Sequence, residues 1–481
     1  MEETKKSKKG LIIGIIVAVA VIAAGASVFA FRSSRGLTGG SVSTFDAMKN
    51  SAKAMLSRTK PGKFLVDAHE DGKPASMTVD IDDLSLFSPS LSSLPFDIEV
   101  TFTLDGSKKL GCDINLDLFG MLDFSGSFGT TDKELYVDSP SLAEDSYKLT
   151  YATAAEDFKN SIFAPGSDSA YSITDEDSFN QTVEILSALS EKMSSGESFN
   201  IDSLQATLKE NGLKCEFEEA KKDAEVGGEN ISVSARTLTL ESEDIKAYGE
   251  YLEKVFSEDT LLSNSTVSTS FGDIDEITDA LKNFDGTVTI EFDVYGSNLV
   301  KGNFSVVRGE KTSTASFDLG KDPATTSKMT ISSEAGDSKY DVVYDIKDTD
   351  SVYEVDATVN SSDNESYSMT YTYDKSSDEF TINTPTSTDG SNSTALSGKC
   401  TYEGSKMTMA FTEMETTYNG ETETATSDGV KVVFDANAKT PSAPEDAEEF
   451  FKLSEADLNS LIDELTSSKF IQTLALAYIN A

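Results

Sequence analysis

The stretch FDIEVTFTLDG, residues 96–106, alternates apolar and polar residues without interruption. Successive side chains of a β-strand point to opposite faces, so this segment is predicted to be a strand with one apolar and one acidic face. Phe96, Ile98, Val100 and Phe102 share the apolar face. We expect a helix of the same chain to cover this face, because each large apolar side chain left exposed forfeits about 1.5–3 kcal/mol. The acidic face is expected to meet solvent.

The amino-acid composition argues against two classes of binding partner. The chain has 481 residues, of which 83 are acidic and 40 basic, and its formal net charge is −43. This charge argues against nucleic acid, whose recognition relies on clustered Lys and Arg, and against adhesion to anionic lipid headgroups. A chain of this length is expected to fold into more than one domain. Cys112, Cys215 and Cys400 are odd in number and widely spaced, so they form no recognisable disulfide framework or metal motif. Buried apolar thiols are predicted, with a disulfide bridge as the alternative.

An uncharged segment of 21 residues, 11–31, follows a start that contains four lysines. As a helix it would span about 30 Å, the thickness of the hydrocarbon core of a bilayer. The lysines that precede it favour a cytoplasmic N-terminus with the remainder outside the cell. The sequence therefore predicts a single-pass anchor in the cell membrane. The alternative is a cleaved secretory signal that ends near Val28-Phe29-Ala30.

Helix and strand patterns then follow one another in blocks. Helical spacing predicts a helix over 41–60 that Pro61-Gly62 ends, and a strand meander follows over 63–138. A capping arrangement of Thr174 and Asp177 opens a helical region, which includes two predicted strands at 213–220 and 229–240. From residue 286 onwards the chain consists almost entirely of alternating strands separated by turns rich in Gly, Ser and Asp.

The fold class is therefore α+β: an N-terminal transmembrane helix, then extended antiparallel meander sheets, half-barrel-like, with helices packed on the apolar face. Near the C-terminus, Ser454 and Asp457 predict the capped start of a final helix. The predicted divisions are 1–36 as cytoplasmic start and anchor, 37–284 as a mixed α+β extracytoplasmic domain, 285–440 as an antiparallel β-rich domain, and 441–481 as a helical segment that packs on the sheet.

This order of helix, long meander and returning helices resembles the half-barrel of lipoprotein carriers and related surface lipoproteins. Strand order and alternation carry the resemblance, which implies an apolar groove and assigns no residues to it. The Lys-rich start, the single apolar segment and Ser/Thr/Asp-rich strands with one His and no Trp are similar to uncharacterised membrane-anchored ectodomains of clostridial Gram-positive bacteria. That second resemblance implies the location and no activity.

Catalytic signatures are missing from the sequence. His69 is the only histidine, so a multi-histidine metal site cannot be assembled, and its position suggests a solvated turn at the end of a strand. No GxSxG, HExxH, phosphate-binding or dinucleotide-binding motif occurs, and no acidic cluster fits a calcium loop. We therefore expect a protein that is not an enzyme and has no cofactor or metal. Paired carboxylates of a hydrolase are the one catalytic chemistry that the sequence leaves open.

The predicted function is that of a membrane-anchored, non-catalytic extracytoplasmic protein that binds or carries a lipid or another apolar ligand between sheet and helices. The alternative is a structural or protein-interaction component of the bacterial cell envelope. The expected partners are the membrane through residues 11–31, the lipid or apolar ligand, and an envelope protein, but not nucleic acid. The predicted lining of the apolar groove consists of Phe96, Ile98, Val100, Phe102, Phe292, Tyr344 and Tyr371.

Overall fold

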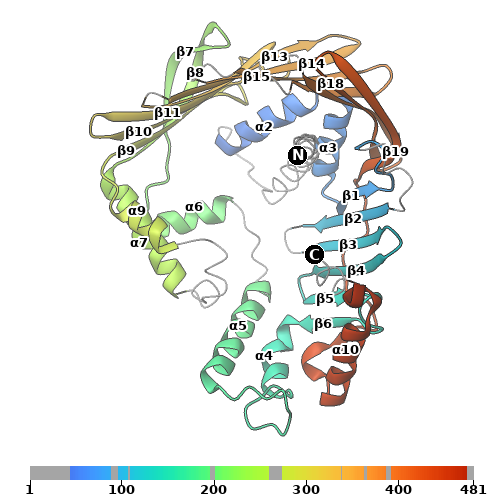
Figure 1. Cartoon of the computed structure of the whole chain (residues 1–481). Helices are drawn as coiled ribbons and strands as arrows, with labels where there is room; N and C mark the ends of the chain where they lie inside the picture. Colours follow the sequence, from blue (N-terminus) through green and yellow to red (C-terminus); the bar gives the residue numbers. More distant parts are fainter. Residues whose placement is uncertain are drawn as a thin grey trace.

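A computed structural model describes residues 44–87, 96–106, 109–194, 201–258, 274–336, 338–361, 366–385 and 392–473. The predicted anchor, residues 11–31, lies outside these ranges. Within them, no helix combines the length and the apolar character needed to cross a membrane. The described chain is a β-rich α+β fold whose twenty strands form one large open sheet, which confirms the predicted class (Figure 1).

The sheet is built from two meanders that meet side by side. Its order is β7 to β19 in sequence, then β1 to β6, because β19 pairs with β1. Neighbours are antiparallel except β20, which pairs with β6 in parallel and makes the sheet mixed. The strands are β1 Ala75–Ile81, β2 Phe96–Asp105, β3 Lys109–Leu118, β4 Leu122–Thr130, β5 Glu134–Asp138, β6 Tyr147–Thr150, β7 Glu218–Val226, β8 Glu229–Leu240, β9 Thr287–Tyr295, β10 Asn298–Arg308, β11 Lys311–Asp318, β12 Lys328–Ala335, β13 Ser338–Asp348, β14 Val352–Ser361, β15 Ser366–Asp374, β16 Glu379–Pro385, β17 Ser393–Glu403, β18 Lys406–Tyr418, β19 Glu421–Asp435 and β20 Glu448–Glu449.

The helices gather in three places around the sheet. Figure 1 shows α2 and α3 inside the arc of the sheet, α7 and α9 beyond β9, and α4, α5 and α10 beyond β6. The helices are α2 Thr44–Leu56, α3 Lys60–Asp71, α4 Tyr151–Lys159, α5 Glu176–Ser194, α6 Ile201–Glu210, α7 Ser242–Glu258, α9 Ile274–Lys282 and α10 Glu455–Ser467, and a short 3₁₀ helix, η4, covers Phe450–Lys452.

The largest core lies between α3 and the strands on either side of the junction of β19 with β1. Phe64 and Leu65 of α3 pack against buried side chains of these strands. A second core forms where Ala47 of α2 meets Phe292, Val294 and Leu299. The buried members of the first core are Met77, Leu86, Tyr373, Phe380, Cys400, Met407, Phe411, Val430, Val432 and Phe434.

Pro61 and Gly62 open a helix, so the predictions of a helix end and of a strand from residue 63 are wrong. Thr59 is the N-cap of α3, and its hydroxyl accepts a hydrogen bond from Gly62 N at 3.2 Å. Proline suits the first turn because the backbone donor that it lacks has no intrahelical acceptor there. A Cβ on Gly62 would lie 2.0 Å from the Leu56 carbonyl oxygen, so this turn requires glycine. His69 therefore lies in the last turn of α3 and not at the end of a strand.

Other local predictions have mixed outcomes. The capping box of Ser454 and Asp457 at the start of α10 is confirmed. Asp175, and not Thr174, accepts hydrogen bonds from Asp177 N and Ser178 Oγ at the start of α5. The strand predicted at 213–220 is displaced, because β7 begins at Glu218. Its Lys and Glu residues break the apolar alternation, as is common on the exposed edge of a sheet.

The predicted domain boundary at 284/285 falls between α9 and β9, where the sheet is continuous. β8 precedes this boundary and β9 follows it, and the two strands pair over seven register positions from Ser234↔Val294 to Leu240↔Val288. The division of the chain into domains stays a prediction.

Two cations, Arg58 in the link between α2 and α3 and Lys60 at the start of α3, fix this helix pair to the sheet. The Arg58 side chain is buried, and it donates hydrogen bonds from Nε to Asp348 Oδ2 at 3.1 Å and from Nη1 to Thr326 O at 2.9 Å. Lys60 Nζ lies 2.6 Å from Asp378 Oδ2. Burial opposes ionisation of both carboxyls, but the hydrogen bonds of Asp348 from Lys375 and Arg58 outweigh it and lower the pKa. Lys60 and Tyr373 lower the pKa of Asp378 in the same way.

Substitution Arg58→Ala is expected to reduce the free energy of unfolding by about 2 kcal/mol, because Asp348 Oδ2 and the Thr326 carbonyl lose their Arg58 donors while Lys375 still pairs with Asp348. Denaturation in guanidinium chloride measures the loss. Lys63→Ala, which breaks the exposed i,i+4 pair with Asp67, is the control and should cost less than about 0.5 kcal/mol. Equal small losses in both variants would contradict the assigned role of Arg58.

The two lowered pKa values also predict a pH dependence. A carboxyl whose pKa is lower in the folded than in the unfolded chain stabilises the fold above the unfolded pKa of about 4, and this stabilisation is lost as the pH falls through the folded pKa. The double variant Asp348→Asn, Asp378→Asn should therefore lose less unfolding free energy between about pH 5 and pH 3 than the parent chain. Unfolding curves at several pH values measure this; parallel profiles for the two proteins would refute it.

Candidate functional site

All seven residues predicted to line an apolar groove lie on one side of the sheet. The register connects them: Phe102 faces Met77, which faces Phe434 across the junction. On the other meander, Phe292 pairs with Gly302 and Gly302 with Phe317. From Phe317 the row of paired residues continues to Ile331 and then to Val342. Tyr344 and Tyr371 lie on the same face of the sheet as this row.

Three of the seven residues are covered by helices or by their neighbours. Phe292 is buried beneath α2, with its ring 5.7 Å from that of Phe217. Tyr371 packs against the core under α3 and meets Tyr353 edge to face at 6.5 Å. Burial raises the pKa of the Tyr371 phenol, so this group stays neutral. Tyr344 is half-buried. These side chains therefore contribute to packing and offer little surface to a ligand.

Strands β2 to β5 leave large apolar side chains exposed on the same side. Phe102, Leu110, Phe128, Leu135 and Val137 are between 43% and 48% exposed, and we call them the apolar patch. They form two adjacent rows, since Phe102, Cys112, Phe128 and Val137 are register partners, and so are Leu110, Thr130 and Leu135. The expectation that a helix covers Phe102 is wrong for the described chain.

The patch lies between two covered regions of the same face. On the β1 side, Met77 and Phe434 continue the row of Phe102 but are buried in the core under α3. On the β6 side, Tyr147 packs edge to face on Phe450 at 6.4 Å. Along the strands, Phe470 covers Phe124 at 4.8 Å, and Phe119 lies 6.0 Å from Phe96. Ile98 and Val100 are half-buried next to the patch.

The opposite, polar side of these strands is partly covered by the segment 436–447, which we call the strap. Ala438 N donates to Pro74 O at 3.0 Å, and Thr440 Oγ1 donates to Asp105 Oδ2 at 2.9 Å. Beyond the strap, β20 joins the sheet beside β6. The acidic face of β2 is therefore not uniformly a solvent face, since Thr103 is buried.

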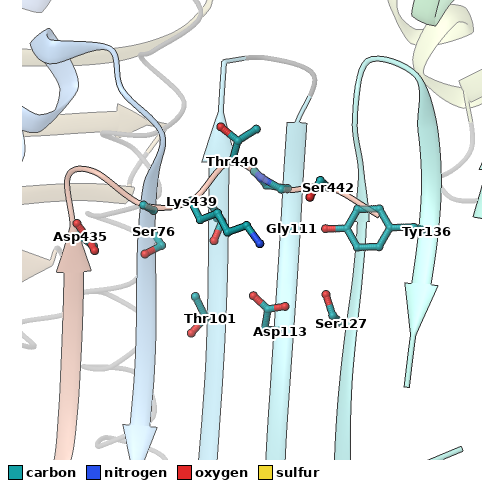
Figure 2. Close-up of a pocket in the computed structure, with 13 residues that line it drawn as sticks. Ser76, Thr101, Gly111, Asp113, Ser127, Tyr136, Asp435, Lys439, Thr440 and Ser442 are labelled. Carbon is teal, nitrogen blue, oxygen red and sulfur yellow. The ribbon is translucent and has the colours of Figure 1, made fainter. Parts of the chain in front are cut away.

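A polar pocket of about 340 Å³ lies between the strap and this side of the sheet (Figure 2). Two glycines make room for it: Gly111 and Gly129 are register partners on β3 and β4. A Cβ on Gly129 would lie 2.6 Å from the Tyr136 hydroxyl oxygen, and a Cβ on Gly111 would lie 3.2 Å from Pro441. The lining consists of Ser76, Thr101, Thr103, Gly111, Asp113, Ser127, Tyr136, Asp435, Ala438, Lys439, Thr440, Pro441 and Ser442.

The pocket carries charges of both signs among many hydroxyls. Figure 2 shows Asp113 and Lys439 pointing into the same space from the sheet and the strap. Asp435 is already engaged, because its Oδ1 accepts from Ser405 Oγ at 2.7 Å and from Asn437 N at 2.9 Å. Burial and the charge of Asp113 raise the pKa of the Tyr136 phenol, so this hydroxyl keeps its proton. The pocket can thus donate and accept hydrogen bonds.

The sequence alone does not predict this pocket. Gly111 and Gly129 are visible in KLGCD and SFGTT, but only the strand register shows that they are neighbours. Lys439 and Pro441 lie more than 300 residues further along the chain. Among the described residues, no cluster of three or more His, Cys, Asp or Glu could hold a metal ion. Cys112 and Cys400 are buried as predicted, while Cys215 is half-buried.

No family model, curated protein or solved structure matches this chain. The two surfaces of β2 to β5 are therefore the features of the structure that bear on function.

Phe434 and Phe102 lie in one row of paired residues but differ in exposure, so truncating them should reduce the free energy of unfolding by different amounts. Phe434→Ala should reduce the free energy of unfolding by about 3–5 kcal/mol, since the ring is fully buried. Phe102→Ala, in the same row but 43% exposed, should cost less than about 2 kcal/mol. Chemical denaturation of both variants measures the difference. A cost for Phe102→Ala equal to that for Phe434→Ala would mean that the patch is covered in solution.

Proposed function

We propose that this protein binds a lipid by laying an acyl chain across the apolar patch of β2 to β5. The observation that carries the proposal is the contiguity of five large, half-exposed apolar side chains on one side of a sheet. Scattered apolar residues are normal on a protein surface, but a contiguous patch of this kind is typical of a binding surface.

The chemistry of the patch favours a flexible apolar chain. Cys112, Thr130 and Leu104 are the other residues of its rows on β2 to β5, so no ionised group lies within them. Each methylene removed from water contributes about 0.8 kcal/mol, which rewards a ligand that follows the rows across several strands. The formal charge of −43 disfavours an anionic headgroup and favours a zwitterionic or neutral lipid.

The predicted membrane anchor supports the same proposal. If residues 11–31 span the bilayer, the chain from Thr44 onwards begins close to a supply of lipid. The proposal then describes a non-catalytic, extracytoplasmic protein of the cell membrane with a half-barrel-like sheet. In the alternative function, the patch receives an apolar segment of another envelope protein.

Photo-crosslinking tests the proposal with the full-length protein in phosphatidylcholine vesicles that contain a lipid with a diazirine in its acyl chain. Peptide mass spectrometry should locate crosslinks in residues 96–138, separately from any in residues 11–31. The double variant Phe102→Ser, Phe128→Ser should reduce the crosslinks in 96–138 about tenfold, because it removes two aromatic contacts.

Ile277→Ser is the matched control, since Ile277 is 51% exposed on α9, away from the patch. It should leave the crosslinks in residues 96–138 unchanged. Crosslinks confined to residues 11–31 would refute lipid binding at the patch and favour a protein partner.

A further inference from the structure

We infer that the polar pocket beneath the strap is a binding site for a neutral sugar ring. This inference goes beyond lipid binding and does not depend on it, because the pocket and the apolar patch lie on opposite sides of the same strands. Gly111 and Asp113 face the pocket, whereas Cys112 between them faces the patch.

The pocket has the size and the construction of a small-molecule site. Its volume of about 340 Å³ lies at the lower end of the range of roughly 300–1,000 Å³ that is usual for such sites. The paired glycines lower its floor, and Tyr136 forms one wall. Ala438 and Thr440 tie the strap to neighbouring ends of β1 and β2 through their hydrogen bonds to Pro74 and Asp105, so the roof is part of the fold.

The hydroxyl content of the pocket indicates a polyhydroxylated ligand. A hydroxyl both donates and accepts hydrogen bonds, and the hydroxyls of a sugar do the same, so each can adapt to the other. Some of the pocket hydroxyls already have partners: Thr101 bonds to Thr78 at 2.8 Å and Thr440 bonds to Asp105. The hydroxyl-bearing residues are Ser76, Thr101, Thr103, Ser127, Tyr136, Thr440 and Ser442.

The charged groups of the pocket orient a bound sugar through hydrogen bonds and disfavour anions. The Asp113 carboxylate can accept from two neighbouring hydroxyls of a sugar, and the Lys439 ammonium can donate to a third oxygen. Asp113, Asp435 and Lys439 together give the lining a negative net charge, within a chain of formal charge −43. A phosphate or sulfate would meet repulsion there, so the ligand that fits is uncharged.

The test uses the full-length protein in a polyoxyethylene detergent, because maltoside detergents would themselves offer sugar. Saturation-transfer NMR and titration are carried out with the methyl glycosides of glucose, galactose, mannose and N-acetylglucosamine. At least one glycoside is expected to bind. Asp113→Asn and Gly111→Ala should each weaken its binding at least tenfold, the second by placing a methyl group against Pro441.

Asp97→Asn is the matched control, because Asp97 is exposed on the same face of β2 but outside the pocket. It should leave sugar binding unchanged. Lys439→Gln provides a second test on the strap, at an exposed position whose substitution should not affect folding. Unfolding midpoints of all variants verify that they are folded.

Three results would overturn the inference. One is that none of the four glycosides binds, and another is that binding is unaffected by Asp113→Asn, Gly111→Ala and Lys439→Gln. The third is binding of a zwitterion such as alanine in place of any sugar, since Asp113 and Lys439 would then serve an amino acid. Loss of lipid crosslinking in the patch variants would leave the sugar result unchanged, so the failures of the two proposals are distinguishable.

Discussion

The strand register is the constraint on which the rest of this structure depends. Side chains alternate between the faces of a strand, so one sheet of twenty strands keeps an apolar and a polar side only if every neighbouring pair is in phase. The chain maintains this phase through irregularities at Leu299/Lys301, Ser397/Gly398 and Phe411/Glu413. At the junction of the two meanders, Met77 continues the apolar row from Phe434 to Phe102. Both candidate surfaces follow from this register.

The strand register does not determine which elements cover the apolar side of the sheet, and the described helices cover only part of it. The helix pair α2–α3 is held over β9–β10 and the β19–β1 junction by buried packing and by the ion pairs of Arg58 and Lys60. The C-terminal segments cover β6 through Phe450, which packs on Tyr147, and the start of β4 through Phe470, which packs on Phe124. Strands β2 to β5 lie between these regions, and their exposed side chains lose the free energy that burial would provide. A ligand that covers them would recover part of it.

The sequence predicts the faces of the strands but not what covers them. Alternation in FDIEVTFTLDG places Phe96 to Phe102 on the apolar side correctly, because a period of two is a local property. Pro61-Gly62 wrongly predicts the end of a helix because the pair is typical of a turn, whereas the cap at Thr59 makes it a helix N-terminus. The polar pocket could not be predicted, since it depends on the register of Gly111 with Gly129 and on Pro441, which approaches from far along the chain.

The two surfaces of β2 to β5 share their backbone but not their side chains. A slip of one residue in β3 would exchange Cys112 with Gly111 or Asp113 and would destroy the patch and the pocket together. A substitution at Phe102 or Asp113, in contrast, changes one side and leaves the register intact. The proposed lipid binding and the inferred sugar binding would therefore require the same fold yet could be lost separately. A variant that loses both proposed activities would therefore indicate a disturbed strand register. A variant that loses only one would indicate an effect confined to the patch or to the pocket.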